Sequence, residues 1–596
     1  MKFIKIGLLL LTSVLIAAFF MCLPDMRTAP EIGNDSGNNR KKNALVCICI
    51  TLAYSLLAFT GLGTLNDPQT FAELTSGSSV LLELEEPSPV DRVFLYSGIT
   101  VGEYCVSLSP DGHEFYAAAP VNQDFAQILK WKNPEWSAIY PGSVRFIKLT
   151  GVSGNPRIGE IGAFSGRTKL TFKASENAAA CAVTDEQNTV PTADTYLNSS
   201  YFDEIYHVRT AKEHIEGISP YEISHPPLGK LIIGLGIRIF GLVPFGWRFM
   251  GTLFGVLMVP AIYIFLTLMF HNTLVSACGS ILLASDFMHF TQTRIATIDS
   301  FAVLFIILMY LFMYRFVAEG KNRDLALSGV LFGLGAASKW TCLYAGAGLA
   351  VIWLAYWCGK IITARNQKKD TILRFLKNCG FCILFFVLVP AVIYYVSYAP
   401  YGVARGLTGP RMFFSREYFR TVMENQSFML NYHKGVNSTH PYSSTWYQWM
   451  LDIRPILYYL KYYSDGTRSS FGAFVNPALC WGGLIAMLML VYVTVRHKDN
   501  TAAFIVLGYL AQLVPWIPVS RILFEYHYFA CTVFLVLAMG YMFSAMSRLK
   551  RGKWFVVGYA MLSVVLFGLF YPAISGKRVD SSLASALLAW LPTWPF

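Results

Sequence analysis

The residues whose types and spacing could do chemistry in this chain stand close together, between positions 201 and 230. Asp203 and Glu204 are adjacent carboxylates, and His225 and Lys230 follow in the same polar stretch. Adjacent side chains on a helix or turn point in different directions, so the carboxylates predict two separate roles rather than one chelating pair. Exposed acidic pairs are most often solvated surface. The nearby histidine and lysine favour a functional interpretation here.

Signatures of several other chemistries are missing from the sequence. It contains no GxxxxGK[ST] loop, no GxSxG elbow and no HExxH helix, which argues against an ATPase, a serine hydrolase and a zincin. The net charge of +12 could suggest a nucleic-acid partner. Lys and Arg gather beside the apolar runs, however, where the positive-inside rule would place them. We therefore expect no nucleic-acid partner.

The elements that must position the polar residues are membrane helices. Hydrophobic residues make up 54% of the 596 positions, charged residues only 14%, and the mean hydropathy is +0.45. Several apolar runs approach the roughly 20 residues that cross a hydrocarbon core of about 30 Å as a helix. The composition predicts a polytopic α-helical integral membrane protein with about 11–12 transmembrane helices.

The basic loops on either side of one apolar stretch predict on which side of the membrane the middle of that stretch lies. The basic loops around 315–323 and 360–377 are predicted to be cytoplasmic, so the apolar run 325–358 between them must cross an even number of times. It is therefore predicted to be a hairpin of short helices, since roughly 34 residues span only about 51 Å as helix. Its apex at residues 338–340 faces outward and carries Lys339.

The same rule places most of the unusual polar residues on the non-cytoplasmic side. Arg248, residues 294–299, the loop 398–471 and residues 521–527 all fall outside. The run 228–243 then cannot cross and is predicted to lie along the membrane surface. Ionisable residues at a membrane boundary are costly and therefore candidates for function. A carboxylate beside arginine and lysine at this boundary suggests transfer from a lipid-linked phosphate donor.

Changes in composition divide the chain into six regions. The first is predicted to hold two transmembrane helices, with residues 23–43 cytoplasmic and the N-terminus outside. The others are a β-sandwich, a catalytic external loop with surface-lying helices, a transmembrane core, a second large external loop and C-terminal transmembrane helices. The regions cover residues 1–63, 64–170, 171–243, 244–398, 399–471 and 472–596, in that order.

The β region shows short alternating stretches separated by Pro, Gly and Asp. Residues 144–164 resemble the closing strands of a discoidin-like jelly roll. Such modules often bind sugars, and Trp131 and Trp136 could supply stacking faces. A sandwich that only braces another part of the protein is an equally open interpretation. Cys105 and Cys181 both lie on the predicted outer side, and whether they form a disulfide stays open.

Six motifs, in order, resemble the protein O-mannosyltransferases of the C-type (GT-C) glycosyltransferase superfamily. The resemblance covers about residues 195–575. The β region and the first apolar run depart from the family pattern. The motifs are YFDEIYHVRTA with HPPLGK (201–230), FGWRF around Arg248, TRIATIDSF around Arg294 and Asp299, ASKWT around Lys339, THPYSSTWYQW with the following RP, and RILFEYHYF from Arg521.

The resemblance implies a GT-C fold and an enzyme that uses polyprenyl- or dolichyl-phosphate-linked mannose. Mannose, or a related hexose, would pass with inversion to Ser or Thr hydroxyls of a secreted or membrane protein. Asp203 matches the family's catalytic base, and Glu204 would position the acceptor, the donor or the loop. Arg248, Lys339 and Arg521 are the candidates for binding the donor phosphate.

Further substrate contacts are expected from seven more residues, each with a structural alternative. Arg294 and Asp299 could instead form an ion pair, and the tryptophans could belong to an interfacial belt. A divalent metal is possible, although no cluster has distinctive spacing. The seven residues are His225, Lys230, Arg294, Asp299, His440, Trp446 and Trp449.

The expected setting is a bacterial plasma membrane with the active site facing outside. The expected partners are the lipid-linked donor, a protein acceptor and membrane lipids, with a homo- or heterodimer possible. The same fold glycosylating a lipid or a cell-envelope glycan is the main alternative. A sugar or lipid transporter is less favoured because no internal repeat is seen and the polar residues gather at one surface.

Overall fold

The computed structural model describes residues 2–22, 37–136, 140, 142–364 and 367–596. Most of the segment predicted to be cytoplasmic between the first two helices therefore lies outside the described residues. The chain forms two compact units. The helical unit consists of Met1–Thr60, His214–Ile232 and Gly251–Phe596, and the β unit consists of Gly61–Glu213 and Ile233–Met250.

Long apolar helices dominate the helical unit. Among the described residues, nine helices are long and apolar enough to cross a membrane, or up to ten if the bent pair α7 and α8 counts as one span. The predicted eleven or twelve crossings are reached if the shorter helices α10 and α18 also cross. These helices are α1 (Lys2–Met21), α2 (Gly37–Phe59), α6 (Pro244–Phe270), α7 (Thr273–Ala284), α8 (Phe287–Thr293), α9 (Asp299–Glu319), α10 (Asn322–Ser338), α11 (Thr341–Thr363), α12 (Lys368–Cys382), α13 (Val389–Ser397), α17 (Pro477–His497), α18 (Asn500–Leu513), α19 (Phe529–Ser547) and α20 (Gly552–Ser575).

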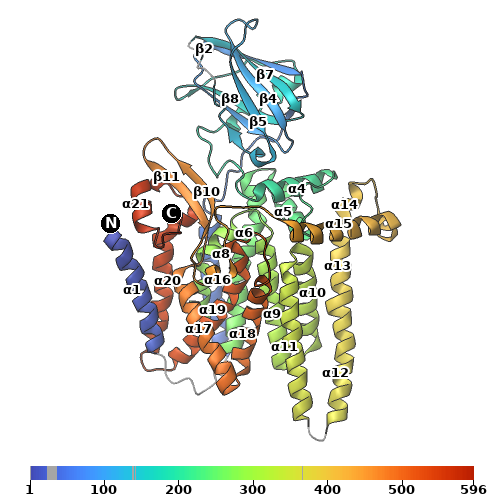
Figure 1. The fold of residues 1–596 in the computed structure, drawn as a ribbon, viewed down its shortest axis with the longest axis vertical. Coiled ribbons are helices and arrows are strands. Elements are labelled where there is room, and N and C mark those ends of the chain that lie inside the picture. Colours follow the sequence, from blue (N-terminus) through green and yellow to red (C-terminus); the bar gives the residue numbers. More distant parts are fainter. Residues whose placement is uncertain (1, 23–36, 137–139, 141, 365–366) are drawn as a thin grey trace. The chain divides into compact units, whose positions relative to one another are not determined.

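The helix break at Lys339 agrees with the predicted hairpin. α10 ends at Ser338, Lys339 is extended, and α11 begins at Thr341. The two helices run side by side in the helical unit, next to the long rod of α12 and α13 (Figure 1). Because Lys339 closes one helix just before the next begins, its side chain is carried at the end of the hairpin rather than along a helix face.

Shorter elements follow the span that contains α13. The candidate span ends at Val403, and α15 (Arg416–Gly435) begins soon afterwards. A small core of aromatic side chains joins α13, α14 and α15, centred on Tyr398 and Tyr418. The other elements of this part are α14 (Ala399–Val403), α16 (Trp446–Met450), β10 (Ile456–Tyr462), β11 (Thr467–Ala473), β12 (Val579–Asp580) and α21 (Ser581–Leu587).

The β unit contains two antiparallel sheets. One has the order β2–β7–β4–β5, and the other has the order β1–β8–β3–β6 with β9 paired to β8. Residues predicted to be closing strands form β7 and β8. Burial alternates along β7, whereas β8 is buried along nearly its whole length. The strands are β1 (Ala72–Glu73), β2 (Ser79–Ser88), β3 (Arg92–Ser97), β4 (Gly102–Ser109), β5 (Tyr116–Gln123), β6 (Trp131–Lys132), β7 (Val144–Gly154), β8 (Arg157–Ser165) and β9 (Thr168–Lys169).

Two questions about the sandwich that the sequence left open are answered by its packing. Trp131 is buried, with only 3% of its surface exposed, and its ring lies 5.2 Å from that of Tyr96. It cannot present a face to a sugar, and Trp136 packs against the core. Cys105 and Cys181 are both free thiols, so no disulfide joins them.

Three short helices carry the polar stretch of residues 171–243. They are α3 (Ala178–Cys181), α4 (Glu204–Glu216) and α5 (Leu228–Phe240). At about 1.5 Å per residue, the 13 residues of α5 reach only about 20 Å, too short to cross a hydrocarbon core. The surface orientation of α5 stays a prediction.

Candidate active site

Asp203 stands immediately before the first turn of α4. Its carbonyl accepts hydrogen bonds from the backbone N–H groups of Tyr206 (3.1 Å) and His207 (3.2 Å), so the backbone turns into the helix at this residue. The preceding residue, Phe202, has a φ of +48°. This left-handed conformation is uncommon for a bulky side chain and is found where a local geometry is required. The side chain of Asp203 is half-buried.

Glu204 and Arg248 form a buried, two-pronged ion pair within the β unit. Arg248 donates from Nε to Glu204 Oε1 and from Nη2 to Oε2, both at 2.7 Å, and both side chains are buried. The three other N–H groups of the guanidinium go to backbone carbonyls at 2.8–2.9 Å. These carbonyls belong to Leu62, Tyr196 and Ser199.

This pairing argues against the predicted phosphate-binding role of Arg248. A guanidinium has five N–H donors, and all five are used inside the protein. Glu204 likewise accepts from the backbone N–H of Tyr201 at 3.2 Å. Of the three roles open to Glu204, the structure therefore favours positioning the loop that carries Asp203.

Lys230 is also held inside the protein. Its ammonium group is buried and donates to the Glu222 carboxylate at 2.5 Å, to the Glu222 carbonyl at 2.7 Å and to the His225 carbonyl at 3.1 Å. An ammonium has three donors, so these bonds account for its capacity. Lys230 therefore fixes the shape of the segment around His225, which replaces the expected direct substrate contact.

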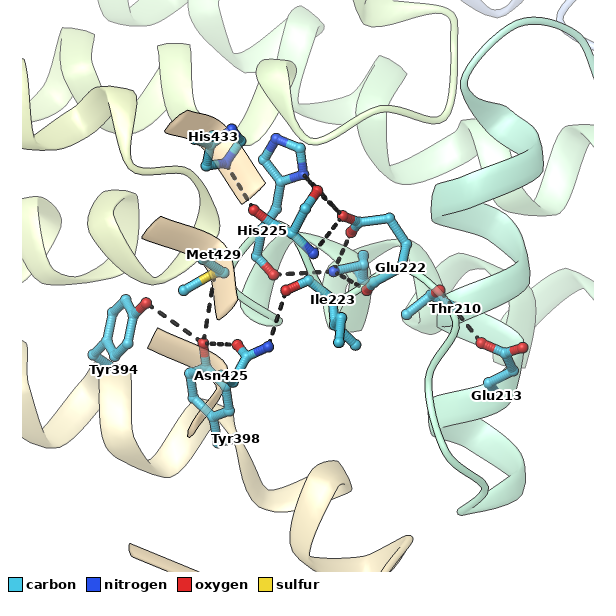
Figure 2. A network of polar contacts seen from close by, with 12 residues as sticks. Thr210, Glu213, Glu222, Ile223, His225, Tyr394, Tyr398, Asn425, Met429 and His433 are labelled. Carbon is cyan, nitrogen blue, oxygen red and sulfur yellow. Dashed lines mark hydrogen bonds and ion pairs between the residues drawn. The ribbon is translucent and has the colours of Figure 1, made fainter. Parts of the chain in front are cut away.

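Glu222 is the centre of this arrangement, and the sequence analysis did not single it out. Its Oε1 accepts from the Ser224 N–H at 2.8 Å and from the Ser224 hydroxyl, and lies 3.1 Å from His225 Nδ1 (Figure 2). The spacing Glu-x-x-His was the available signal. Because the carboxylate can only accept when ionised, it favours the histidine tautomer with the proton on Nδ1.

α15 holds the same segment from the other side. Asn425 donates to the carbonyl of Ile223 at 2.9 Å, and His433 Nε2 lies 2.9 Å from the carbonyl of Ser224 (Figure 2). A carbonyl only accepts, so His433 carries a proton on Nε2. These two α15 residues were also missed, because nothing in their spacing points to a partner about two hundred positions earlier.

A chain of hydrogen bonds connects α15 to the apex of the α10–α11 hairpin. Trp340 donates to Tyr394 at 3.0 Å, and Tyr394 donates to Gln426 at 2.7 Å. Gln426 in turn donates to Tyr398, which donates to Asn425 at 2.7 Å. The residue next to Lys339 is therefore rigidly joined to the helix that supports the segment 222–225.

Lys339 pairs with Asp299 rather than standing alone. The ammonium group lies 2.6 Å from Asp299 Oδ1, and both side chains are largely buried. It also lies 5.5 Å from the centre of the Tyr526 ring. Asp299 was expected to pair with Arg294 or to touch substrate. Arg294 instead donates to the carbonyls of Ala58 and Thr60, at 3.0 and 2.7 Å.

Of the three candidate phosphate-binding residues, Arg521 has the weakest hydrogen bonding within the described residues. Within the described residues, the hydrogen bond found for its guanidinium is a 3.5 Å contact to the carbonyl of Ile522. The side chain is half-buried. A guanidinium with this much unused donor capacity is suited to an anionic ligand such as a phosphate.

Positive groups converge around His433. Burial, followed by the charges of His225, Arg521 and Lys339, lowers the pKa of His433 from 6.5 to about 4. Its ring centre lies 5.3 Å from that of His225. The imidazole is therefore neutral at pH 7 and adds no charge of its own to this part of the protein.

The remaining predicted residues lie in the long loop that includes α16. Trp449 is fully buried, donates to Ser444 at 2.8 Å and stacks on His527. It is a packing residue and cannot line a groove, contrary to expectation. His440 contacts the Phe524 ring at 5.0 Å, and Trp446 is half-buried.

A cavity of about 260 Å³ lies beside the segment 219–223. Its lining mixes apolar side chains with hydrogen-bonding ones from α14 and α15, including Ile223, Tyr401, Asn425 and Phe428. Among the described residues, no group of three or more His, Cys, Asp or Glu side chains is arranged to hold a metal ion. The predicted divalent metal therefore has no counterpart in the described part of the chain.

Two family models match consecutive parts of the sequence. Residues 224–396 match "Dolichyl-phosphate-mannose-protein mannosyltransferase", and residues 418–594 match "C-terminal four TMM region of protein-O-mannosyltransferase". Together they cover more than half of the chain. The chain belongs to the protein O-mannosyltransferase family. The two matches begin at residue 224, so residues 1–223, which include the β-sandwich, lie outside both of them.

Curated bacterial relatives agree with the family assignment. The chain is 25% identical to the polyprenol-phosphate-mannose–protein mannosyltransferase of Mycobacterium tuberculosis, over 62% of this chain and 81% of that protein. It is 26% identical to the protein of the same name from Corynebacterium glutamicum, over 73% of this chain and 92% of that protein.

The fold agrees as well. The structure resembles a solved chain of the S. cerevisiae protein O-mannosyltransferase Pmt1–Pmt2 complex bound to the sugar donor, with a TM-score of 0.57 and 13% identity. The match covers 67% of this chain and 89% of that chain. The predicted GT-C membrane fold is confirmed, and the protein is a GT-C glycosyltransferase.

Proposed function

We propose that this protein transfers mannose from a polyprenyl-phosphate donor to Ser or Thr hydroxyls of proteins on the non-cytoplasmic face of a membrane. The family and the names of its relatives support the donor, the sugar and the protein acceptor. The bacterial relatives also support a bacterial plasma membrane as the setting. A dimer, as in the yeast complex, stays a prediction.

The observation that carries the proposal is the cationic group at the end of the α10–α11 hairpin. Lys339 lies at the end of this hairpin, 5.5 Å from the centre of the Tyr526 ring. The charges of Lys339 and Arg521 both lower the pKa of His433, and the Arg521 guanidinium makes a single 3.5 Å hydrogen bond within the described residues. A phosphate with a lipid tail needs cations at a helix end, where the headgroup can meet charge while the tail stays in the apolar region. Arg521 is assigned as the main phosphate contact and Lys339 as a supporting charge.

Asp203 is assigned as the general base of a single displacement. The acceptor hydroxyl oxygen attacks the anomeric carbon from the face opposite the phosphate. The hydroxyl proton passes to the Asp203 carboxylate, and the bond to the phosphate oxygen breaks, so the lipid phosphate leaves with its electron pair. One base and no covalent sugar intermediate give inversion, which suits one principal carboxylate because Glu204 is already bound to Arg248.

The cavity beside residues 219–223 supports a protein acceptor. Its lining combines aromatic, aliphatic, hydroxyl and amide side chains with the ion pair of Arg405 and Glu424, and such a mixture is suited to a polypeptide segment. An acceptor that is a lipid or a cell-envelope glycan is the competing possibility, and it is distinguished by the acceptor assay.

The deciding experiment supplies purified protein with polyprenyl-phosphate mannose and Ser/Thr-containing peptides. We expect transfer with inversion, measured by mass and by the anomeric configuration of the product. Asp203→Asn should lower turnover by about 10²–10⁴-fold, the usual contribution of a general base. Asp194→Asn is the matched control, since Asp194 is another half-buried aspartate of the same unit.

The outcomes separate the competing functions. Full activity of Asp203→Asn would remove this residue as the base. Transfer to glycan acceptors but never to peptides would replace the protein acceptor. Movement of the donor lipid across a vesicle membrane without transfer would favour a transporter.

A further inference from the structure

The surface of α15 is divided into three faces. One face packs against the aromatic core formed with α13 and α14. At 3.6 residues per turn, the buried positions cluster on a single side of the helix. They are Tyr418, Thr421, Val422, Asn425 and Met429.

A second apolar face of α15 is exposed. Phe419, Met423 and Leu430 are 55%, 43% and 47% exposed. They lie within about 40° of one another around the helix axis and about 120° from the buried face. Phe414, just before the helix, is 90% exposed. Large apolar side chains gathered in this way on a surface indicate an interaction site.

Basic side chains border this exposed apolar face. Arg416, Arg420 and Lys434 follow it around the helix, about 40–80° further from the buried face, and all three are exposed. Arg420 pairs with Glu424 at 2.7 Å. A helix with an apolar stripe next to Arg and Lys lies in the interface of a membrane, with its cations at the level of the lipid phosphates.

We propose that α15 lies in the headgroup layer of the membrane and binds anionic phospholipid. Phe414 and the exposed apolar stripe enter the acyl boundary, and the three basic side chains contact lipid phosphates. The place of α15 in the chain favours this occupant, because the preceding candidate span ends at Val403. The helix thus begins at the membrane surface. It is itself too charged to be one of the spans found.

Lipid binding at α15 bears directly on the segment 222–225. Asn425 and His433, on the same helix, hold the carbonyls of Ile223 and Ser224. A helix fixed to the headgroup layer therefore fixes that segment at a defined depth in the membrane. This depth is the level at which a lipid-linked phosphate presents its charged group.

The test places a photoreactive benzophenone amino acid at position 423 in the full-length protein, in phosphatidylcholine nanodiscs with and without phosphatidylglycerol. Irradiation followed by mass spectrometry identifies the partner. Position 431 is the matched control, because Asn431 is exposed on the same helix but outside the apolar stripe. We expect about tenfold more lipid adduct at 423 than at 431, since only the stripe enters the acyl boundary.

Charge dependence is tested in the same assay with Arg416→Gln, Arg420→Gln and Lys434→Gln combined. We expect phosphatidylglycerol to be enriched among the adducts, and the enrichment to fall by about fivefold for each basic residue removed. Replacing Lys550, Arg551 and Lys553 by Gln should leave the enrichment unchanged. Adducts to a second copy of the chain, or equal lipid adducts at 423 and 431, would overturn the proposal. Neither result depends on transferase activity.

Discussion

At the residue scale, Arg248 and Arg521 differ in how many of their guanidinium N–H groups are hydrogen-bonded within the protein. Arg248 donates all five N–H groups to Glu204 and to backbone carbonyls, whereas Arg521 makes one long hydrogen bond in the described structure. Buried ion pairs cost desolvation, and removing one partner leaves an uncompensated charge. Arg248 therefore stabilises the loop before α4, and Arg521 stays the proposed contact for the donor phosphate.

Removing the Arg248 guanidinium should destabilise the protein. We expect Arg248→Met to lower the free energy of unfolding by about 3–5 kcal/mol, because Glu204 is left buried without a partner. Denaturant unfolding of the detergent-solubilised protein measures this. The double variant with Glu204→Leu should lose less than the sum of the two single variants. Unchanged stability with a raised KM for the donor would return Arg248 to the phosphate site.

Removing the Arg521 guanidinium should instead affect transfer. We expect Arg521→Gln to lower kcat/KM for the donor by about 10²–10³-fold, the scale of a lost electrostatic contact in a transition state. The free energy of unfolding should stay within about 0.5 kcal/mol of the wild type. Arg551→Gln, an exposed arginine between α19 and α20, is the control and should change neither quantity. Equal transfer by the Arg521 variant would rule out the phosphate role.

At the scale of elements, α15 and the hairpin apex support the segment 222–225 together. Hydrogen bonds run from Trp340 through Tyr394, Gln426 and Tyr398 to Asn425, which reaches Ile223. Networks of this kind are specific because each buried polar group needs its partner. The geometry near Lys339 is therefore coupled to the position of α15.

The contact between His433 and the Ser224 carbonyl should make the stability of the segment 222–225 depend on pH. Its pKa is about 4 in the folded protein and 6.5 ordinarily, so the unfolded chain binds more protons between these values. The contribution of neutral His433 to the free energy of unfolding is complete above pH 6.5 and is lost as the pH falls toward 4. Positive neighbours on several elements, His225, Arg521 and Lys339, repel the imidazolium, while Glu222 faces His225.

Hydrogen exchange of the backbone amides in residues 222–225 measures the effect. We expect protection to fall between pH 6.5 and 4 in the wild type, after correction for intrinsic exchange. His433→Gln, which can still donate to the Ser224 carbonyl but does not titrate, should show a smaller fall. Identical pH profiles for the two proteins would contradict the assignment to His433.

At the scale of the whole molecule, the β-sandwich has a hydrophobic core of its own. Its buried residues come from both sheets and include Leu82, Leu95, Val106 and Ile147. Neither family model reaches it. A segment of this size with a contiguous core is expected to fold independently.

Residues 66–190 expressed alone should therefore form a folded domain. We expect a cooperative thermal transition with a near-ultraviolet circular dichroism signal from fixed aromatic side chains. Leu95→Asp should abolish both, because Leu95 is fully buried. A fragment without a cooperative transition would show that the sandwich depends on the rest of the chain.

The sequence by itself determined the architecture of this protein. Hydropathy and the positions of Lys and Arg predicted the membrane helices and the outward apex at Lys339, because insertion depends on local composition. Short alternating stretches predicted a β region, the resemblance of residues 144–164 to a jelly roll predicted the strands that became β7 and β8, and the ordered motifs indicated the family.

Only the tertiary structure decided which polar residues form hydrogen bonds and ion pairs with one another. Arg248 meets Glu204 across 44 positions, and His433 meets Ser224 across 209. Spacing along the chain does not encode such distant pairings, whereas burial makes a charged group without a partner costly. In the described structure Arg248 and Lys230 bind other groups of the protein and Trp449 is buried, whereas Arg521 makes a single 3.5 Å hydrogen bond. The proposal that Arg521 contacts the donor phosphate rests on this difference.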